Sequence, residues 1–394
     1  MKVILFLIGV FIAEFLYAQP DPGFNKKEAR DMIALCNSFT FLDLYNTDTM
    51  IVPAEYKKIY TSGVFGMDNK YQLYTKGNTA VICFRGSTDK QISWVENIYS
   101  SMIPANGVMT ISGEKFEYSF AKDSNAAVHA GYALGIAFLH NEILYQVNTL
   151  NRQGIFKIII TGHSQGGALA NMLRAYLENT EHGEIDVRNK FTTYAFAAPM
   201  SGNKFFTREY NERYAKNGSS FNIINHADPI PDFPLSYNDT AKLADNLKTL
   251  LYNKDSFNLG RIALDKGTFY LKNNINQLLS LVGTSAAKKI SKEIGDVAMP
   301  RYTKDINYFR VANVIEISGS DYPKILKDSS ILQNDSLMAI YSKDIEGNFT
   351  DEKLYAKEPW AYQHKPYNYY VSFLKIYYPE EYKLLKKKYL LENL

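Results

Sequence analysis

The stretch that decides the fold is Gly154-Ile155-Phe156-Lys157-Ile158-Ile159-Ile160-Thr161-Gly162-His163-Ser164-Gln165-Gly166-Gly167-Ala168-Leu169-Ala170, followed by residues 171–178. Residues 155–160 form a short apolar run, rich in β-branched side chains and broken only by Lys157, which is typical of a buried strand. Good helix formers such as alanine and leucine predominate after Gly167. The sequence therefore predicts a strand, a tight glycine-bounded turn and a helix.

A serine at the tip of such a turn has a hydroxyl that is accessible for reaction. The turn is too tight for side chains on its flanks, which explains Gly162 and Gly166, and it pushes the Ser164 hydroxyl clear of the sheet. The N–H groups of the following helix face any negative charge that forms nearby. The pentapeptide alone would arise by chance in roughly one chain in ten of this length. Its position between a buried strand and an Ala-rich helix makes Ser164 a candidate nucleophile.

Strand and helix patterns alternate along the rest of the chain. A strand pair is expected within 64–74, around Asp68-Asn69. Buried strands are predicted at 79–84, 191–197 and 221–226, with a last strand at 308–317. Helices are predicted at 26–44, 128–150 and 203–216, and a helix rich in Tyr and Lys is expected after His364 to the end. The alternation from about 79 to 234 predicts an α/β fold with a mostly parallel central sheet flanked by helices.

Two segments have a different character. Residues 93–120 hold apolar side chains without a clean period, which predicts a poorly packed loop or a mobile cover. Residues 236–305 are Asn/Lys-rich with helical patterns, and we expect a helical insertion before the last strand that covers one edge or mouth of the sheet. The alternative for 236–305 is an independent small domain. Lys386, Lys387 and Lys388 are interpreted as a solvated helix face.

The N-terminus is typical of a secretory signal peptide. One basic residue, Lys2, precedes a short apolar run, and Ala18 offers a small residue for cleavage. The alternative is a membrane anchor, but Glu14 interrupts the run, which falls short of the roughly 20 apolar residues that a span needs. We therefore expect a signal peptide at 1–18, one α/β-hydrolase domain at 19–394, and a secreted or periplasmic protein.

Composition limits the classes of function. The chain has 394 residues, of which 46% are hydrophobic and 22% charged, so it can bury a core and is not disordered. A net charge of +3 gives no argument for a nucleic-acid partner. Two cysteines exclude a disulfide scaffold. Cys83 lies in an apolar run and is expected to be a buried thiol, with a Cys36–Cys83 bridge as the alternative.

A serine nucleophile needs a base and an orienting acid, and chain order narrows both. In α/β-hydrolase topology the order is serine, acid, histidine. Asp228 follows a predicted strand, and His364 is the only one of six histidines that comes after it. Asp228 before Pro229 is also a common turn signal, and His364 could be a surface residue. His226 is the strongest competitor for the role of base.

Five motifs then occur in an order that resembles the class 3 (fungal-type) lipases, a family of α/β-hydrolases. The resemblance covers about 79–234, with His364 beyond it. The motifs are Phe84-Arg85-Gly86-Ser87, Val128-His129-Ala130-Gly131-Tyr132, Thr161-Gly162-His163-Ser164-Gln165-Gly166-Gly167-Ala168-Leu169-Ala170, Ala197-Ala198-Pro199 with Gly202-Asn203, and His226-Ala227-Asp228-Pro229-Ile230-Pro231.

The resemblance implies roles for particular residues. Ser164 would be the nucleophile, Asp228 the orienting acid and His364 the base, while Ser87 and Gln165 would supply the oxyanion donors. It also makes Trp94 and the segment after it a candidate lid. Two features depart from the family pattern. Asp228 and His364 are further apart than in compact members, and 93–120 shows no clear amphipathic lid helix.

The expected function is hydrolysis of carboxylic esters, those of lipids in particular, through an acyl-enzyme, with a lipid–water interface as partner and no metal or cofactor. Phospholipase A1 and short-chain or polysaccharide esterases share this machinery, and acyl transfer to an alcohol remains open. The alternative from another class is a non-catalytic binding protein on the same fold.

Overall fold

The computed structural model describes residues 23–45, 51–180, 183–234, 290–292, 294–359 and 361–391. The expected signal peptide at 1–18 lies outside these residues, as does most of the expected helical insertion at 236–305, because 235–289 are not described. Among the described residues, no helix is both long and apolar enough to cross a bilayer.

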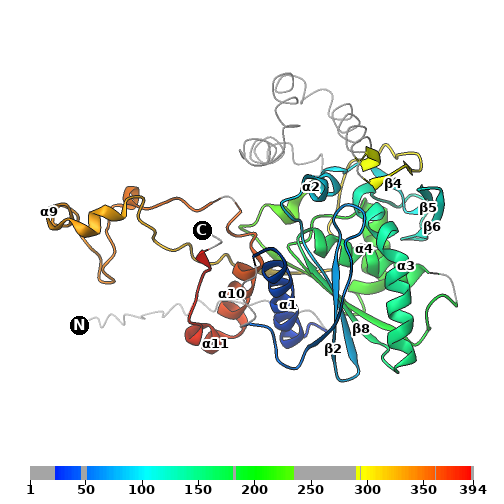
Figure 1. The fold of residues 1–394 in the computed structure, drawn as a ribbon, viewed down its shortest axis with the longest axis horizontal. Helices are drawn as coiled ribbons and strands as arrows, with labels where there is room; N and C mark the ends of the chain where they lie inside the picture. The colour runs from blue at the N-terminus through cyan, green and yellow to red at the C-terminus, as the bar shows by residue number, and fades with distance from the viewer. Residues whose placement is uncertain are drawn as a thin grey trace, which may run out of the picture.

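The core is a seven-stranded sheet with the order β1-β2-β3-β8-β9-β10-β12 (Figure 1). Its strands are β1 (Lys57–Thr61), β2 (Tyr71–Lys76), β3 (Thr79–Phe84), β8 (Lys157–His163), β9 (Lys190–Phe196), β10 (Ser220–Asn225) and β12 (Asn313–Ile317). The first three strands pair antiparallel, and β3, β8, β9, β10 and β12 are parallel. The expected mostly parallel central sheet is confirmed.

Strand β8 is covered on both faces, which explains its continuous apolar sequence. Ile158 and Ile160 pack in the cluster formed with α3 (Ala130–Arg152) and α4 (Gln165–Asn179). Ile159 points to the other face, where α1 (Lys26–Tyr45) and α10 (Pro366–Tyr377) lie side by side (Figure 1). The sheet therefore sits between two layers of helices, as the sequence predicted.

The expected loop at 93–120 is wrong, because regular elements fill this segment. They are α2 (Gln91–Ile98), β4 (Met102–Pro104), β5 (Asn106–Ile111) and β6 (Glu114–Ser119). β5 and β6 form a hairpin that β11 (Val297–Ala298) extends, and β4 pairs with β7 (Ala127–His129). On β6 only Phe116 and Tyr118 are buried, and on β5 only Met109, so the alternation was too sparse to detect.

The expected strand pair around Asp68-Asn69 is also wrong. β2 pairs with β1 and β3, and the turn at Asp68 closes only an isolated bridge between Phe65 and Asn69. Asp68 has a positive φ of 67°, and its carboxylate contacts Arg85 and Lys90. The turn is therefore shaped by long-range ion pairs rather than by strand pairing.

Several short elements complete the described part of the chain. These are α5 (Lys204–Tyr210), which continues into the π-helical turn η1 (Asn211–Ala215), then η2 (Ile230–Asp232), η3 (Ser329–Gln333), α9 (Asp335–Met338), η4 (Glu352–Leu354) and α11 (Pro379–Leu384). The segment from η3 to η4 stands out from the sheet at the left of Figure 1. The expected helix face at Lys386–Lys388 is wrong, because α11 ends before it.

Both cysteines are buried and free, so the expected buried thiol at Cys83 is confirmed and the alternative Cys36–Cys83 bridge is absent. Their sulfur atoms lie 3.9 Å apart, between α1 and β3.

Candidate active site

Three chain segments that carry the predicted site residues meet at one edge of the sheet. Ser164 follows β8, Asp228 follows β10, and Gly86-Ser87 follows β3. Because these strands run parallel in one sheet, with β3 next to β8 and only β9 between β8 and β10, their carboxyl ends share an edge, which is where α/β sheets bind ligands.

Ser164 sits on a strained elbow between β8 and α4. Its backbone has φ 59° and ψ −128°, a conformation that side chains rarely adopt. A Cβ on Gly162 would lie 2.2 Å from the carbonyl oxygen of Gly166, and one on Gly166 would lie 2.7 Å from that of Phe84. Glycine is therefore needed on both flanks of Ser164, as predicted, because a Cβ at either position would clash with a backbone carbonyl oxygen.

The side chains of Ser164, His364 and Asp228 form a continuous hydrogen-bonded row. His364 Nε2 lies 2.8 Å from Ser164 Oγ, and His364 Nδ1 lies 2.8 Å from Asp228 Oδ2. The Asp228 side chain is fully buried, whereas the His364 side chain is 18% exposed. A carboxylate beside Nδ1 holds the proton on that nitrogen and leaves Nε2 as the acceptor for the serine hydroxyl.

Asp228 is held by two further donors. The backbone N–H of Ile230 donates to Oδ1 at 2.9 Å, and the hydroxyl of Tyr369 donates to Oδ2 at 2.7 Å. Burial, and then the Asp228 charge, raise the pKa of Tyr369 well above its usual value, so the phenol keeps its proton. The carboxylate is therefore fixed from both sides.

The loop that carries His364 is tied to the sheet by Gln363. Gln363 Oε1 accepts from Asn225 Nδ2 at the end of β10 and from the N–H of Ser320, both at 3.0 Å. Tyr369 and Gln363 were missed from the sequence, since nothing in their spacing separates them from the other polar and aromatic residues around His364.

The other described histidines do not reach the serine. His226 is exposed. His129 caps α3 and stacks on Tyr132, and burial lowers the pKa of His129 to about 3. His163 lies beside His364 with ring centres 4.8 Å apart, and burial lowers the pKa of His163 well below its usual value. His140 contacts the ring of Phe116 and the carbonyl oxygen of Ala137.

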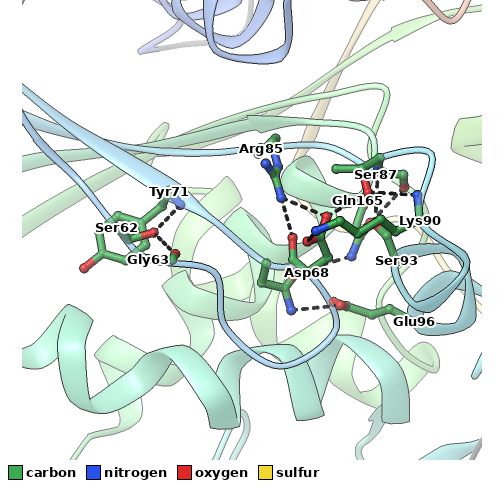
Figure 2. Close-up of polar contacts among 12 residues, drawn as sticks. Ser62, Gly63, Asp68, Tyr71, Arg85, Ser87, Lys90, Ser93, Glu96 and Gln165 are labelled. Carbon is green, nitrogen blue, oxygen red and sulfur yellow. Dashed lines mark hydrogen bonds and ion pairs between the residues drawn. The ribbon is translucent and has the colours of Figure 1, made fainter. Parts of the chain in front are cut away.

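The loop after β3 lies directly against the elbow. A Cβ on Gly86 would be 3.0 Å from the carbonyl oxygen of His163 and 3.6 Å from Ser164 Cβ. The side chains of Ser87 and Gln165 are hydrogen-bonded, with Ser87 Oγ 2.8 Å from Gln165 Oε1 (Figure 2). Gln165 opens α4, so its N–H has no carbonyl partner within the helix. Both predicted donors thus lie beside Ser164.

Sequence comparison gives a match to the family described as Lipase (class 3), over residues 81–238. A secreted mono- and diacylglycerol lipase 1 from Fusarium solani is 32% identical over 79 residues, which are 20% of this chain and 21% of that protein. The chain therefore spans about a fifth of the length of this curated relative.

Solved structures of fungal lipases resemble part of the chain. Lipase II from Rhizopus niveus is 20% identical with a TM-score of 0.39, covering 53% of this chain and 74% of that one. A Rhizopus microsporus var. chinensis lipase is also 20% identical with a TM-score of 0.39, covering 53% and 69%. The overlap is partial at these scores, and the assignment depends on the sequence match. The likeness to the class 3 lipase family is therefore a sequence match over residues 81–238 of this chain.

Proposed function

We propose that this protein is a serine hydrolase that cleaves carboxylic esters of lipids through an acyl-enzyme. The observation that carries the proposal is the row Ser164–His364–Asp228, with both hydrogen bonds at 2.8 Å. Such a row provides a nucleophile, a base in reach of its proton, and an acid that orients the base.

The geometry supports the following cycle. Ser164 Oγ attacks the ester carbonyl while His364 Nε2 takes its proton, and the imidazolium then returns that proton to the leaving alcohol. Asp228 stabilises the imidazolium. Water repeats the same steps to release the acid. The backbone N–H groups of Ser87 and Gln165 would bind the tetrahedral oxygen, each contributing about 3–4 kcal/mol to the transition state.

Lipid esters are the substrate class favoured by the family match and by the Fusarium solani relative, which is a mono- and diacylglycerol lipase. The test is hydrolysis of emulsified triolein compared with p-nitrophenyl butyrate in solution. Release of fatty acid from triolein would support a lipase. Activity confined to the short ester would point to a short-chain esterase, and activity on phosphatidylcholine to a phospholipase A1.

The role of Ser164 is tested with a fluorophosphonate probe, which reacts only with an activated serine. We expect the wild-type protein to be labelled and Ser164→Ala to be unlabelled and inactive. Full esterase activity in Ser164→Ala would overturn the proposed mechanism. A wild-type protein that is folded but unlabelled would favour the non-catalytic binding protein. Because no metal or cofactor enters the cycle, activity should survive EDTA.

We also propose export through a signal peptide at 1–18. The charged and apolar pattern of the N-terminus supports it, as does the secretion of the Fusarium solani relative. Expression of the whole chain in a secreting host should release a protein whose N-terminal sequence starts near Gln19. Retention of Met1 in the recovered protein would contradict cleavage.

A further inference from the structure

Helix α2 turns a polar face toward Gln165, the residue after Ser164. Ser93, Glu96 and Asn97 occupy positions i, i+3 and i+4 of this helix, so they lie on one side of it. Ser93 is 1% exposed and Glu96 is fully buried. An amphipathic cover that rests on a substrate groove would bury its apolar face, and α2 instead buries polar side chains at this point (Figure 2).

The side chain of Gln165 makes the hydrogen bonds that hold this polar face of α2. Its Oε1 accepts hydrogen bonds from Ser87 Oγ at 2.8 Å and from Ser93 Oγ at 3.0 Å. Its Nε2 donates to Asn69 Oδ1 at 3.3 Å, and Asn69 Nδ2 in turn donates to Glu96 Oε2 at 2.8 Å. Asn97 Nδ2 also lies 3.5 Å from Gln165 Oε1. Gln165 therefore holds α2 directly through Ser93 and Asn97, and through Asn69 at Glu96.

Asn97 connects the same helix to α3 and to the loop after β3 that carries Gly86 and Ser87, hereafter the oxyanion loop. Its Nδ2 donates to Ser87 Oγ at 2.9 Å, and its Oδ1 accepts from the Tyr132 hydroxyl at 3.0 Å. Its carbonyl oxygen lies 3.2 Å from His129 Nε2. The hydroxyl of Ser87 thus lies between a donor on α2 and an acceptor on Gln165.

The backbone of α2 also lies directly on α3. A Cβ on Gly131 would be only 2.0 Å from the Glu96 carbonyl oxygen, and one on Gly135 would be 2.5 Å from Glu96 Oε1. Burial raises the pKa of Glu96 to about 8, so the carboxyl is neutral at pH 7. Moving α2 away would leave several buried polar groups without partners, and unpaired buried groups are costly.

We propose that α2 is a fixed wall of the oxyanion site rather than a lid, and that the side chain of Gln165 is the positioning residue that ties it to Ser87. The inference rests on the proposed serine esterase function and goes beyond it. Opening of α2 then does not control the access of substrate, although Trp94 lies on this helix. Loss of the α2 contacts should therefore disorder the oxyanion loop and lower turnover.

The test uses Ser93→Ala/Asn97→Ala and Gln165→Met, assayed on monomeric p-nitrophenyl butyrate and on emulsified triolein. For a wall, kcat should fall about tenfold on both substrates, with KM and the ratio of the two activities little changed. For a lid, loosening α2 should instead raise activity on the monomeric ester and abolish the activation by emulsion. Ser93→Thr, which keeps the hydroxyl, should retain the wild-type kcat, and Asn148→Ala on the far part of α3 is the matched control.

A second measurement does not depend on activity. Backbone amides of α2 should exchange with deuterium as slowly as those of α4, both in buffer and with detergent micelles. Faster exchange of α2 on addition of micelles would overturn the fixed wall even in a fully active enzyme. If the wild-type protein is not labelled by the fluorophosphonate, the esterase function fails, while the exchange experiment still decides between wall and lid.

Discussion

At the scale of single residues, the site depends on which ring reaches Ser164. His364 lies 2.8 Å from the serine hydroxyl, whereas His226, the competing candidate from the sequence, is exposed. We expect His364→Ala to lower kcat for p-nitrophenyl butyrate by about four orders of magnitude, because the proton acceptor is gone. His226→Ala should stay within about twofold of wild type. Equal, mild losses in the two variants would contradict the assignment.

Tyr369 is the residue-scale feature that the sequence did not reveal. Its hydroxyl donates to Asp228 and accepts from the N–H of Asn225. Tyr369→Phe removes both bonds without changing the ring, so we expect kcat to fall about tenfold and KM to change little, since Tyr369 acts through Asp228. Steady-state kinetics on a soluble ester check this. A rise in KM with kcat intact would mean that Tyr369 acts on substrate binding instead.

Glu96 makes stability depend on pH in a defined direction. Its pKa is raised by burial from 4.5 to about 8, so between these values the folded protein binds a proton that the unfolded chain has released. The resulting stabilisation is complete below about pH 4.5 and is lost as pH rises through about 8, at up to about 1.4 kcal/mol per pH unit.

Glu96→Gln isolates this effect, because glutamine fits the same space and has no charge. The unfolding free energy of the variant minus that of wild type should increase between pH 5 and pH 8, measured by urea denaturation. Burial, and then the Glu96 charge, raise the pKa of Tyr132, whereas burial lowers the pKa of His129, which contacts Asn97 on the same helix as Glu96. A difference that stays constant across this pH range would show that Glu96 does not titrate as described.

At the scale of elements, Gly131 on α3 is needed so that α2 can pack closely against this helix. Ala in place of Gly normally stabilises a helix by about 0.5–1 kcal/mol. At Gly131 a Cβ would lie 2.0 Å from the carbonyl oxygen of Glu96 on α2, an atom that cannot move without the helix. We expect Gly131→Ala to destabilise by about 2 kcal/mol or more and to lower kcat, because α2 is displaced from Ser87.

The control for that change is Asn148→Ala on the same helix, where the side chain is partly exposed and donates to the carbonyl of Glu184. Its thermal midpoint should lie close to that of wild type. Stabilisation by Gly131→Ala, as in an ordinary helix, would mean that α2 is free to shift.

At the scale of the whole molecule, the position of His364 depends on helix packing on the face of the sheet opposite to α4. α10 lies against α1 and directly follows His364, and Phe373 on α10 is fully buried next to Phe24 and Tyr377. Phe373→Ala should cost about 3–5 kcal/mol of unfolding free energy. Esterase activity should be lost on heating no later than the helical circular dichroism signal.

Lys375→Met is a matched control on α10, because this side chain is exposed and pairs with the exposed Asp321. Such pairs contribute about 0–1 kcal/mol, and the variant should stay close to wild type in both measurements. If Phe373→Ala unfolded like wild type, α10 would not be held by the core as described.

Elements that are encoded within a short stretch of neighbouring residues were predictable from the sequence. The apolar run at 155–160, the glycines around Ser164 and the helix after Gly167 carry their information within about twenty residues, and sterics at Gly162 and Gly166 allow little else. The order of Ser164, Asp228 and His364 along the chain was enough to propose the three partners, because parallel strands bring their carboxyl ends to one edge.

Only the tertiary structure revealed α2, the β5–β6 hairpin, Tyr369 and the side-chain role of Gln165. The hairpin buries few residues, so its period is weak, and α2 buries polar side chains that read as solvent-exposed in a one-dimensional pattern. Gln165 and Tyr369 acquire their partners from segments tens to hundreds of residues away. A local sequence pattern records whether a residue prefers burial or solvent, but a hydrogen bond between distant segments exists only once the chain has brought them together.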